Sequence, residues 1–562
     1  MMLVIREYLS MLKESEELDS LLNDLLLSIG LIPLDKPQIG VRQYGVDIKA
    51  IGKLKDDLKK TIYLFVIKQG GIKRDIWDSG PQAVRQSLNE INDFYLDSML
   101  EEHYKDYPIK IILCTNGEMD QAVQTNWTGY IKKNSSERIS YDFWGGNTLS
   151  QLINDNLLNE YLFPEEMQKY IRKALAFLDI KDYDFKDIFD LIESIVEKID
   201  ITNTKKLNKS MRMLNLIVNM IHSWGCENGN TFPGYVSINR ALIRLWEKLE
   251  YDDIFNKPTQ TTKSKLIEFM ELLKTQNRIY IDYLNNITPH CNTLHGFSLV
   301  SRNHVQYSNI VYEQISRVST IAYHFMTLSL GKDKIFFKEY THAVNLLMAI
   351  ICNNPSSEIP VTDDQIDPIS MAIIVLSQSD RKKDASQWLS NIVSALKFNY
   401  NFNNVFPLLY TDDEKLIDLH YFEEKYEPKT SLMIFQLFMW MSMLDMKDEY
   451  EQFREYVNNN LSELNLQYWY PDSKYTDFYY KSSLSPYESG LSVTNLTIES
   501  DMDDFKKLLM KQWKKYNSKL NYSFVEFSFP QLGFIVSDHF RVPLLPKYHE
   551  DFYYMINPNQ ES

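Results

Sequence analysis

Two short runs of β-forming residues limit how the N-terminal part of this chain can fold. They cover Gly45–Gly52 and Thr61–Lys68 with a polar turn between them, and each has the length and composition of a strand. Further strands are expected at Ile109–Asn116 and Ile139–Trp144. Helices are expected over residues 3–29, from Pro81 to about Tyr104, near 119–133 and from Asn147 onward. Because helices separate most of the strands, the pattern predicts a mixed α/β sheet covered by helices.

The pattern changes at about residue 166, after which long helical segments dominate and strands are few. A chain of 562 residues is also too long for one hydrophobic core, so several domains are expected. We predict an α/β domain over 1–165 and a helical domain over 166–304. A second helical domain over 305–562 would act as a sensor or in oligomerisation.

Residues 210–300 have the outline of a winged helix-turn-helix. Three helices are expected there, near 210–224, 236–249 and 261–276. Two runs that follow, Arg278–Leu284 and His295–Val300, could pair as a β-hairpin. A plain helical domain with a small hairpin is an equal alternative. The region has few basic residues, which would suit a protein-contact module as well as a DNA-binding one. They are Lys263, Lys265, Lys274 and Arg278.

The C-terminal part has the pattern of paired helices followed by an aromatic tail. The expected pairs are 366–378 with 383–400 and 430–445 with 448–463. The second pair includes the longest nearly apolar run, Leu432–Leu444, which is too short to span a bilayer and is expected to be a buried helix. The tail, from Tyr522 to Pro546, is expected to dock on the helical body.

Composition and charge narrow the class of protein. The net charge of -16 at pH 7 counts against a large surface wrapped on nucleic acid, although a bound metal would supply local positive charge. The N-terminus turns acidic before any sustained apolar stretch and shows no secretory signal. Four scattered cysteines fit a reducing compartment better than a disulfide scaffold. We therefore expect a cytoplasmic protein without membrane association.

Two other kinds of site find little support in the sequence. No GxxxxGK[ST] motif is present, so a P-loop ATPase is not expected. His222 and Cys226 lie four residues apart, and His290, Cys291 and His295 cluster further on. Paired CxxC spacing is absent, however, and an adjacent His and Cys rarely bind one ion together. A zinc site is therefore the less favoured interpretation.

The two β-forming runs carry a carboxylate and a lysine that could serve phosphodiester hydrolysis. Asp47 lies on the first run and Lys68 ends the second. Such hydrolysis needs carboxylates that hold a divalent metal against the phosphate, and a lysine that acts on the attacking water. Adjacent strands would bring the two together, with Lys68 on the same face as Val66. Alternatively, Asp47 is a turn residue at a strand edge and Lys68 an exposed strand end.

Several local patterns between residues 18 and 157 resemble those of the Mrr-type restriction endonucleases, a family with the PD-(D/E)xK nuclease fold. Leu18–Gly30 resembles the first helix of that family, and Gln43–Ile48 its GxD strand. Phe65–Lys68 resembles the strand that ends in the catalytic lysine, and Gly80–Gln86 the helix that packs behind the site. Two later strand-to-helix transitions are also similar, at 113–117 and 143–149.

The resemblance implies an α/β restriction-endonuclease-like domain with metal-dependent DNA endonuclease activity, followed by a largely α-helical region. It implies Asp47 and Lys68 as catalytic residues, and Asp47 with Asp19 as ligands of Mg²⁺ or Mn²⁺. The supporting polar side chains would be Gln43, Gln82 and Gln86, and the nucleic-acid contacts Lys73 and Arg74. Domains of this type are common in bacterial restriction and anti-phage defence, so the expected partners are DNA and either further copies of the chain or another defence protein.

One position departs from the family pattern. The family usually has Glu or Gln two residues before the lysine, where this chain has Val66. Because Mg²⁺ prefers oxygen ligands, Asp19, Gln82 or Gln86 would have to replace the missing one. The alternative is a scaffold or binding protein that keeps the nuclease fold without turnover and acts through its helical region.

Overall fold

The structure is a computed structural model in which the chain forms two compact units. One comprises Met1–Asn228 with Ser264–Glu271, and the other Gly229–Lys263 with Leu272–Ser562. The finer division at residues 165 and 304 stays a prediction. The residues that the structure describes are 2–13, 17–34, 44–54, 57–80, 83–156, 165–177, 184–249, 260–298, 301, 303–331, 334–403, 406–408, 428–471, 490–517, 524 and 529–557.

A five-stranded sheet lies in the first unit, with its strands in the order β1-β2-β3-β4-β5. The strands are β1 (Leu31–Pro33), β2 (Ile48–Gly52), β3 (Thr61–Lys68), β4 (Ile109–Thr115) and β5 (Ile139–Trp144). The pairs β1–β2 and β2–β3 are antiparallel, whereas β3–β4 and β4–β5 are parallel. The prediction of a mixed α/β sheet is confirmed. Strand β1 was not predicted, because three residues that end in proline carry too little strand signal.

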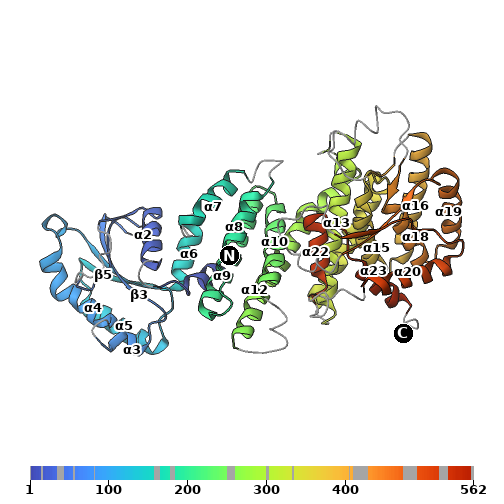
Figure 1. Cartoon of the computed structure of the whole chain (residues 1–562). Helices are drawn as coiled ribbons and strands as arrows, with labels where there is room; N and C mark the ends of the chain where they lie inside the picture. The colour runs from blue at the N-terminus through green and yellow to red at the C-terminus, as the bar shows by residue number, and fades with distance from the viewer. Residues whose placement is uncertain are drawn as a thin grey trace. The chain divides into compact units, whose positions relative to one another are not determined.

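Helices cover both faces of this sheet (Figure 1). The helices of the first unit are α1 (Met2–Leu9), α2 (Asp19–Ser28), α3 (Arg74–Asp78), α4 (Val84–Glu90), the π-helix η2 (Ile91–Met99), the 3-10 helix η3 (Glu102–Tyr104), α5 (Gln121–Asn134), α6 (Gly146–Asn156), α7 (Glu165–Phe177), α8 (Lys186–Val196) and α9 (Thr204–Glu227). In Figure 1, α3, α4 and α5 lie on one face of the sheet and α2 on the other.

The face toward α3, α4 and α5 forms the apolar core. Ile62, Leu64 and Val66 of β3 and alternate residues of β4 pack there against Trp77, Leu88 and other helical side chains. Alternation along a strand explains why every second residue of β3 enters this one cluster. The remaining β3 side chains turn to the opposite face, where Phe65 meets Trp144 edge to face with ring centroids 5.4 Å apart.

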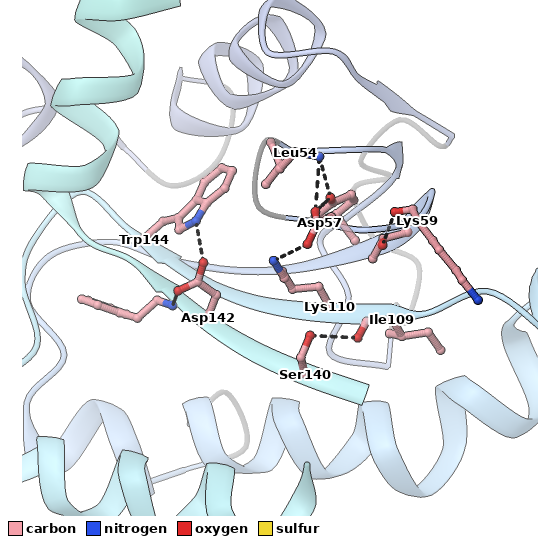
Figure 2. Close-up of polar contacts among 11 residues, drawn as sticks. Leu54, Asp57, Lys59, Ile109, Lys110, Ser140, Asp142 and Trp144 are labelled. Atoms are coloured by element: carbon pink, nitrogen blue, oxygen red, sulfur yellow. Dashed lines mark hydrogen bonds and ion pairs between the residues drawn. The ribbon is translucent and has the colours of Figure 1, made fainter. Parts of the chain in front are cut away.

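Ion pairs and hydrogen bonds on and beside the strands hold part of the opposite face (Figure 2). Lys110 of β4 donates to Asp57 at 2.7 Å, and Tyr63 of β3 also donates to Asp57. Burial alone would raise the pKa of Asp57, but the hydrogen bonds from Lys110 and Tyr63 lower it. The ring N–H of Trp144 donates a hydrogen bond to the Asp142 carboxylate at 3.3 Å. The Lys110 charge thus stabilises the connection between β2 and β3 through its ion pair with Asp57.

The single helix predicted over 3–29 is wrong, because two helices cover that range. The helical ladder stops after Leu9, whose carbonyl accepts a hydrogen bond from the Asn116 side chain at 2.8 Å. The backbone N–H of Lys13 donates instead to the Glu17 carboxylate at 3.0 Å. The contacts to Asn116 and Glu17 therefore interrupt the helix in a stretch where leucine spacing favours one continuous helix.

The second unit is mainly helical. Its elements are α10 (Phe232–Lys248), most of α12 (Gln260–Cys291), α13 (His304–Ser329), α14 (Lys334–Asn353), η6 (Pro355–Glu358), η7 (Asp363–Gln365), α15 (Ile366–Gln378), α16 (Lys382–Phe402), β6 (Thr430–Ser431), α18 (Met433–Met443), α19 (Lys447–Asn460), β7 (Asn465–Leu466), β8 (Tyr468–Tyr470), β9 (Leu491–Val493), α20 (Met502–Tyr516), α22 (Gln531–Phe540) and α23 (Pro546–Ile556). Helix α13 packs against α14, α15 and α22.

The prediction of a β-hairpin in a winged helix is wrong. Arg278–Leu284 lies inside α12, which continues to Cys291. Buried residues recur there at helical spacing, at Ile279, Tyr280, Tyr283 and Leu284, so packing overrides the β-propensity of the isoleucines and tyrosines. Residues 299–300 of the second predicted strand lie outside the described residues.

The predictions for the C-terminal part are largely confirmed. The two expected helix pairs are α15 with α16 and α18 with α19, and all eleven residues of α18 are buried. The described part of the tail is docked, since α22 buries Leu532, Phe534 and Ile535. One helix, α14, is long and apolar enough to cross a membrane by length and composition. Among the described helices it is the one that meets this test, and it packs extensively on α13.

A buried carboxylate caps the apolar helix α18. Asp363 accepts hydrogen bonds from the Ser431 hydroxyl at 2.7 Å, from the Leu432 N–H at 2.5 Å and from the Met433 N–H at 3.0 Å. Burial raises the pKa of Asp363 to about 6, so the group is still mostly ionised at neutral pH. It thereby satisfies N–H groups that a buried helix start would otherwise leave unpaired.

We predict that Asp363→Ala lowers the free energy of unfolding of the second unit by about 3 kcal/mol, because three buried donors lose their acceptor. Chemical denaturation followed by circular dichroism measures this change. Glu455→Ala, an exposed position on α19, serves as the control and should change stability by less than about 0.5 kcal/mol. Equal stabilities of the two variants would contradict the capping role.

Candidate active site

Asp47 lies directly before β2 and is tied to β3 by two hydrogen bonds. Its backbone N–H donates to the Phe65 carbonyl at 2.9 Å, and its carboxylate accepts from the Ile67 N–H at 2.6 Å. A carboxylate held by a strand N–H in this way is fixed in orientation. Asp47 is half-buried, so the fixed group lies at the boundary between the core and solvent.

A glycine sets the turn that leads to Asp47. Gly45 has a φ of 83°, a conformation that favours glycine. A Cβ atom there would lie 2.2 Å from the Ser87 carbonyl oxygen of α4. The glycine of the Gly45-Val46-Asp47 motif is therefore required twice, by its backbone conformation and by the close approach of α4.

Lys68 is the last residue of β3 and is half-buried. Extending the Ile48–Phe65 pairing by one residue places Asp47 opposite Val66, and alternation puts Lys68 on the face of Val66. The structure thus brings Asp47 and Lys68 to the same end of two paired strands, as predicted. Val66 itself is fully buried in the apolar core and contributes no polar atom to the site.

Asp19 is the first residue of α2 and is half-buried. Its position is linked to that of Asp47 through Cys114, a fully buried residue of β4 that pairs with Ile67. Burial raises the pKa of the Cys114 thiol, and the negative charges of Asp19 and Asp47 raise it further. Both carboxylates therefore act electrostatically on this thiol, which alternation with Leu113 places on the α2 face of the sheet. Alternation with Val66 places Lys68 toward the opposite face, so the structure does not bring Asp19 and Lys68 to one face.

The loop after β3 is fixed by residues that the sequence did not single out. Asn116 is buried, accepts from the Gly70 N–H at 2.7 Å and donates to the Leu9 and Leu12 carbonyls at 2.8 and 3.0 Å. Thr115 donates to the Gly70 carbonyl. Polar residues directly after a buried strand were the available signal for these contacts. The loop with Gly70 and Gly71 is therefore fixed by hydrogen bonds to Gly70.

Among the other predicted site residues, Lys73 and Arg74 are exposed at the start of α3, where nucleic acid could reach them. Gln86 is exposed on α4 and lines the same hollow as Tyr44, the residue before Gly45. Gln43 and Gln82 lie outside the described residues. The structure therefore places Gln86 beside the turn that leads to Asp47.

The candidate site has two carboxylates, which are too few to hold a metal ion without other ligands. Within the described parts of the chain, no three His, Cys, Asp or Glu residues gather to hold a metal ion. Mg²⁺ needs no such cage, because it is usually bound by one or two carboxylates together with water and substrate phosphates. Asp47 and Asp19 are the two carboxylates that would hold it. The candidate zinc ligands His222 and Cys226 contact each other, with Sγ 3.5 Å from Nε2.

We predict that Gly45→Ala destabilises the first unit by more than about 2 kcal/mol, because it combines an unfavourable φ with a steric clash. Gly30→Ala is a matched control. Gly30 has nearly the same φ, 84°, but no atom lies within 4 Å of its Cβ position. That variant should lose only about 1 kcal/mol. Unfolding of both variants in urea measures the difference, and similar losses would contradict the role of the α4 contact.

Comparison with known proteins adds no family assignment, since the chain matches no protein-family model, no curated protein and no solved structure.

Proposed function

We propose that the first unit is a metal-dependent DNA endonuclease, an effector of bacterial restriction or anti-phage defence. The observation that supports this most is the hydrogen bond from the Ile67 N–H to the Asp47 carboxylate, on the strand that ends in Lys68. A nuclease of this kind needs a carboxylate and a lysine in fixed relation. Paired β-strands supply that relation.

Each site residue has a separate task in the proposed reaction. Asp47 and Asp19 would hold Mg²⁺ or Mn²⁺, which when bound supplies positive charge that polarises the scissile phosphoryl group. Lys68 would donate a hydrogen bond to the attacking water and stabilise the negative charge that develops on the phosphate. Gln86, at the turn before Asp47, would orient these groups through hydrogen bonds.

Contact with the DNA backbone would come from Lys73 and Arg74. Both are exposed and follow the fixed loop after β3, so a phosphate can approach them without displacing the core. Two other cations that lie on strands are less available. Lys49 is paired with Glu101 at 2.6 Å and Lys110 with Asp57 at 2.7 Å. In a chain of net charge -16, such local cations must provide the attraction for DNA.

A second candidate function is a nuclease-fold scaffold without turnover. The observation that favours it is the burial of Val66 in the apolar core, at the position where the family usually has a metal ligand. This protein would then act by binding a partner through its helical region. The two candidates differ in whether Asp19 replaces the missing ligand.

We predict that Asp47→Asn and Lys68→Met each reduce DNA cleavage with Mg²⁺ or Mn²⁺ by at least about 100-fold. Asparagine can still accept the Ile67 N–H, so the fold should remain intact. Asp47→Asn should also weaken Mn²⁺ binding in calorimetry, whereas Lys68→Met should not. Asp97→Asn, an exposed position on η2, is the control and should cleave like the wild type.

Asp19→Asn tests the replacement of the missing ligand, and we expect it to weaken both cleavage and Mn²⁺ binding as strongly as Asp47→Asn. Cleavage that survives in the Asp47 variant would place the chemistry elsewhere. A wild-type protein that binds Mn²⁺ but cleaves no DNA or RNA would favour the scaffold.

We predict that a double variant, Lys73→Ala with Arg74→Ala, binds DNA more weakly and with a smaller salt dependence. Loss of two phosphate contacts should reduce the slope of log K against log salt concentration by about 2, since each contact contributes about 0.9. A matched double variant, Lys132→Ala with Lys133→Ala, removes the same charge at the exposed end of α5 and should leave the slope unchanged. Equal changes in both would show only a general charge effect.

A further inference from the structure

A charged cavity lies in the second unit, between α13, the start of α15 and the end of α22. Its volume is about 80 Å³, which is space for about three water molecules or a small organic ligand. The ionisable side chains that line it are Glu313, Arg317, Asp364, Asp367, Asp538 and Arg541. Four carboxyl groups and two guanidinium groups line the cavity, so its acidic side chains outnumber its basic ones by two.

The two arginines of the cavity are held by the protein itself. Arg317 forms an ion pair with Glu313 at 2.9 Å and lies over the Phe232 ring at 4.1 Å from its centroid. Arg541 also pairs with Glu313. One carboxylate thus serves both cations. The charge of Arg317 also lowers the pKa of Asp538, and that of Arg541 lowers the pKa of Asp364. The acids of the lining still outnumber the arginines, which favours a cation over an anion.

One of the remaining acids has an oxygen atom that the described residues leave unpaired, which is unfavourable for a buried carboxylate. Oδ1 of Asp364 is buried and has no hydrogen-bond partner among the described residues, although Thr362 bonds to the same carboxylate. Asp367 accepts from the Leu544 N–H at 2.9 Å, and Asp538 from the Tyr235 hydroxyl at 2.7 Å. Burial raises the pKa of all three carboxyls, so a bound cation would relieve an unfavourable arrangement.

The spacing of the acids argues against a metal ion as the ligand. In the described residues no three acidic, histidine or cysteine side chains come together closely enough to hold one. The acids instead lie on four separate elements, with Glu313 on α13, Asp364 in η7, Asp367 at the start of α15 and Asp538 on α22. Hydrogen-bond donors that are distributed along an organic molecule fit this arrangement better than a single ion does.

We propose that this cavity binds a small organic cation, an aliphatic amine or diamine, whose ammonium group donates to Asp364. The ligand bridges α13, α15 and α22, three helices that pack on one another. Binding therefore stabilises the second unit, by an amount that grows with the logarithm of the ratio of ligand concentration to dissociation constant. The site is independent of the proposed nuclease centre, which lies in the other unit.

The test uses the full-length protein and three probes of nearly the same length. The probes are 1,4-diaminobutane, the neutral 1,4-butanediol and the anionic succinate. We expect 1,4-diaminobutane to bind in calorimetry and to raise the midpoint of thermal unfolding of the second unit, and the other two to do neither. Absence of diamine binding, or equal effects from butanediol or succinate, would overturn the proposal.

Variants then connect binding to the cavity. Asp364→Asn should weaken diamine binding at least tenfold, because a charge-assisted hydrogen bond is replaced by a neutral one. Asp538→Asn, which keeps an acceptor for Tyr235, should also weaken binding and provides a second variant if Asp364→Asn does not fold. Glu451→Gln, exposed on α19, removes the same charge and should leave affinity unchanged. Unchanged affinity in folded Asp364→Asn and Asp538→Asn proteins would show that the diamine binds elsewhere.

Discussion

The candidate site depends on the pairing of β2 with β3. The pairing is fixed at its open end by the Asp47 backbone and side chain, which bond to Phe65 and Ile67 on either side of Val66. A slip of one residue would move Lys68 to the other face of the sheet and bury the wrong set of β3 side chains. The apolar alternation Ile62, Leu64, Val66 prevents that slip, because those residues form the core beneath α4 and α5. The same burial that fixes the register also removes position 66 from any role in chemistry.

Much of the first unit could be predicted from sequence because its signals are local. Strands β3, β4 and β5 are continuous runs of β-forming residues, and the Gly45 turn reflects a backbone conformation that few other residues adopt. The site residues Asp47 and Lys68 follow from those runs. What could not be predicted depends on contacts far along the chain. The Asn116 side chain donates to the Leu9 carbonyl at the end of α1, and no pattern around Leu9 indicates this contact.

In the second unit, local sequence patterns predicted some features wrongly and missed others. Arg278–Leu284 has the composition of a strand, yet its neighbours bury it at helical spacing within α12. The charged cavity was also not predicted, since its acids come from α13, η7, α15 and α22, separated by more than two hundred residues between Glu313 and Asp538. Taken alone, none of these helical segments differs from an ordinary charged helix surface. Tertiary packing, which a single sequence does not display, makes them a site.

The contacts of Asn116 also bear on the order in which the chain can assemble. This side chain joins the loop after β3 to residues that precede it by 107 and 104 positions, so the loop cannot be fixed until β4 has been synthesised and has paired with β3. Closing such long loops is entropically slow compared with forming a hairpin. During translation the β2–β3 pair can therefore form before its supports do. On the proposed function, a nascent chain would carry Asp47 and Lys68 without a fixed loop, and cleavage competence would arise only after the first unit is complete.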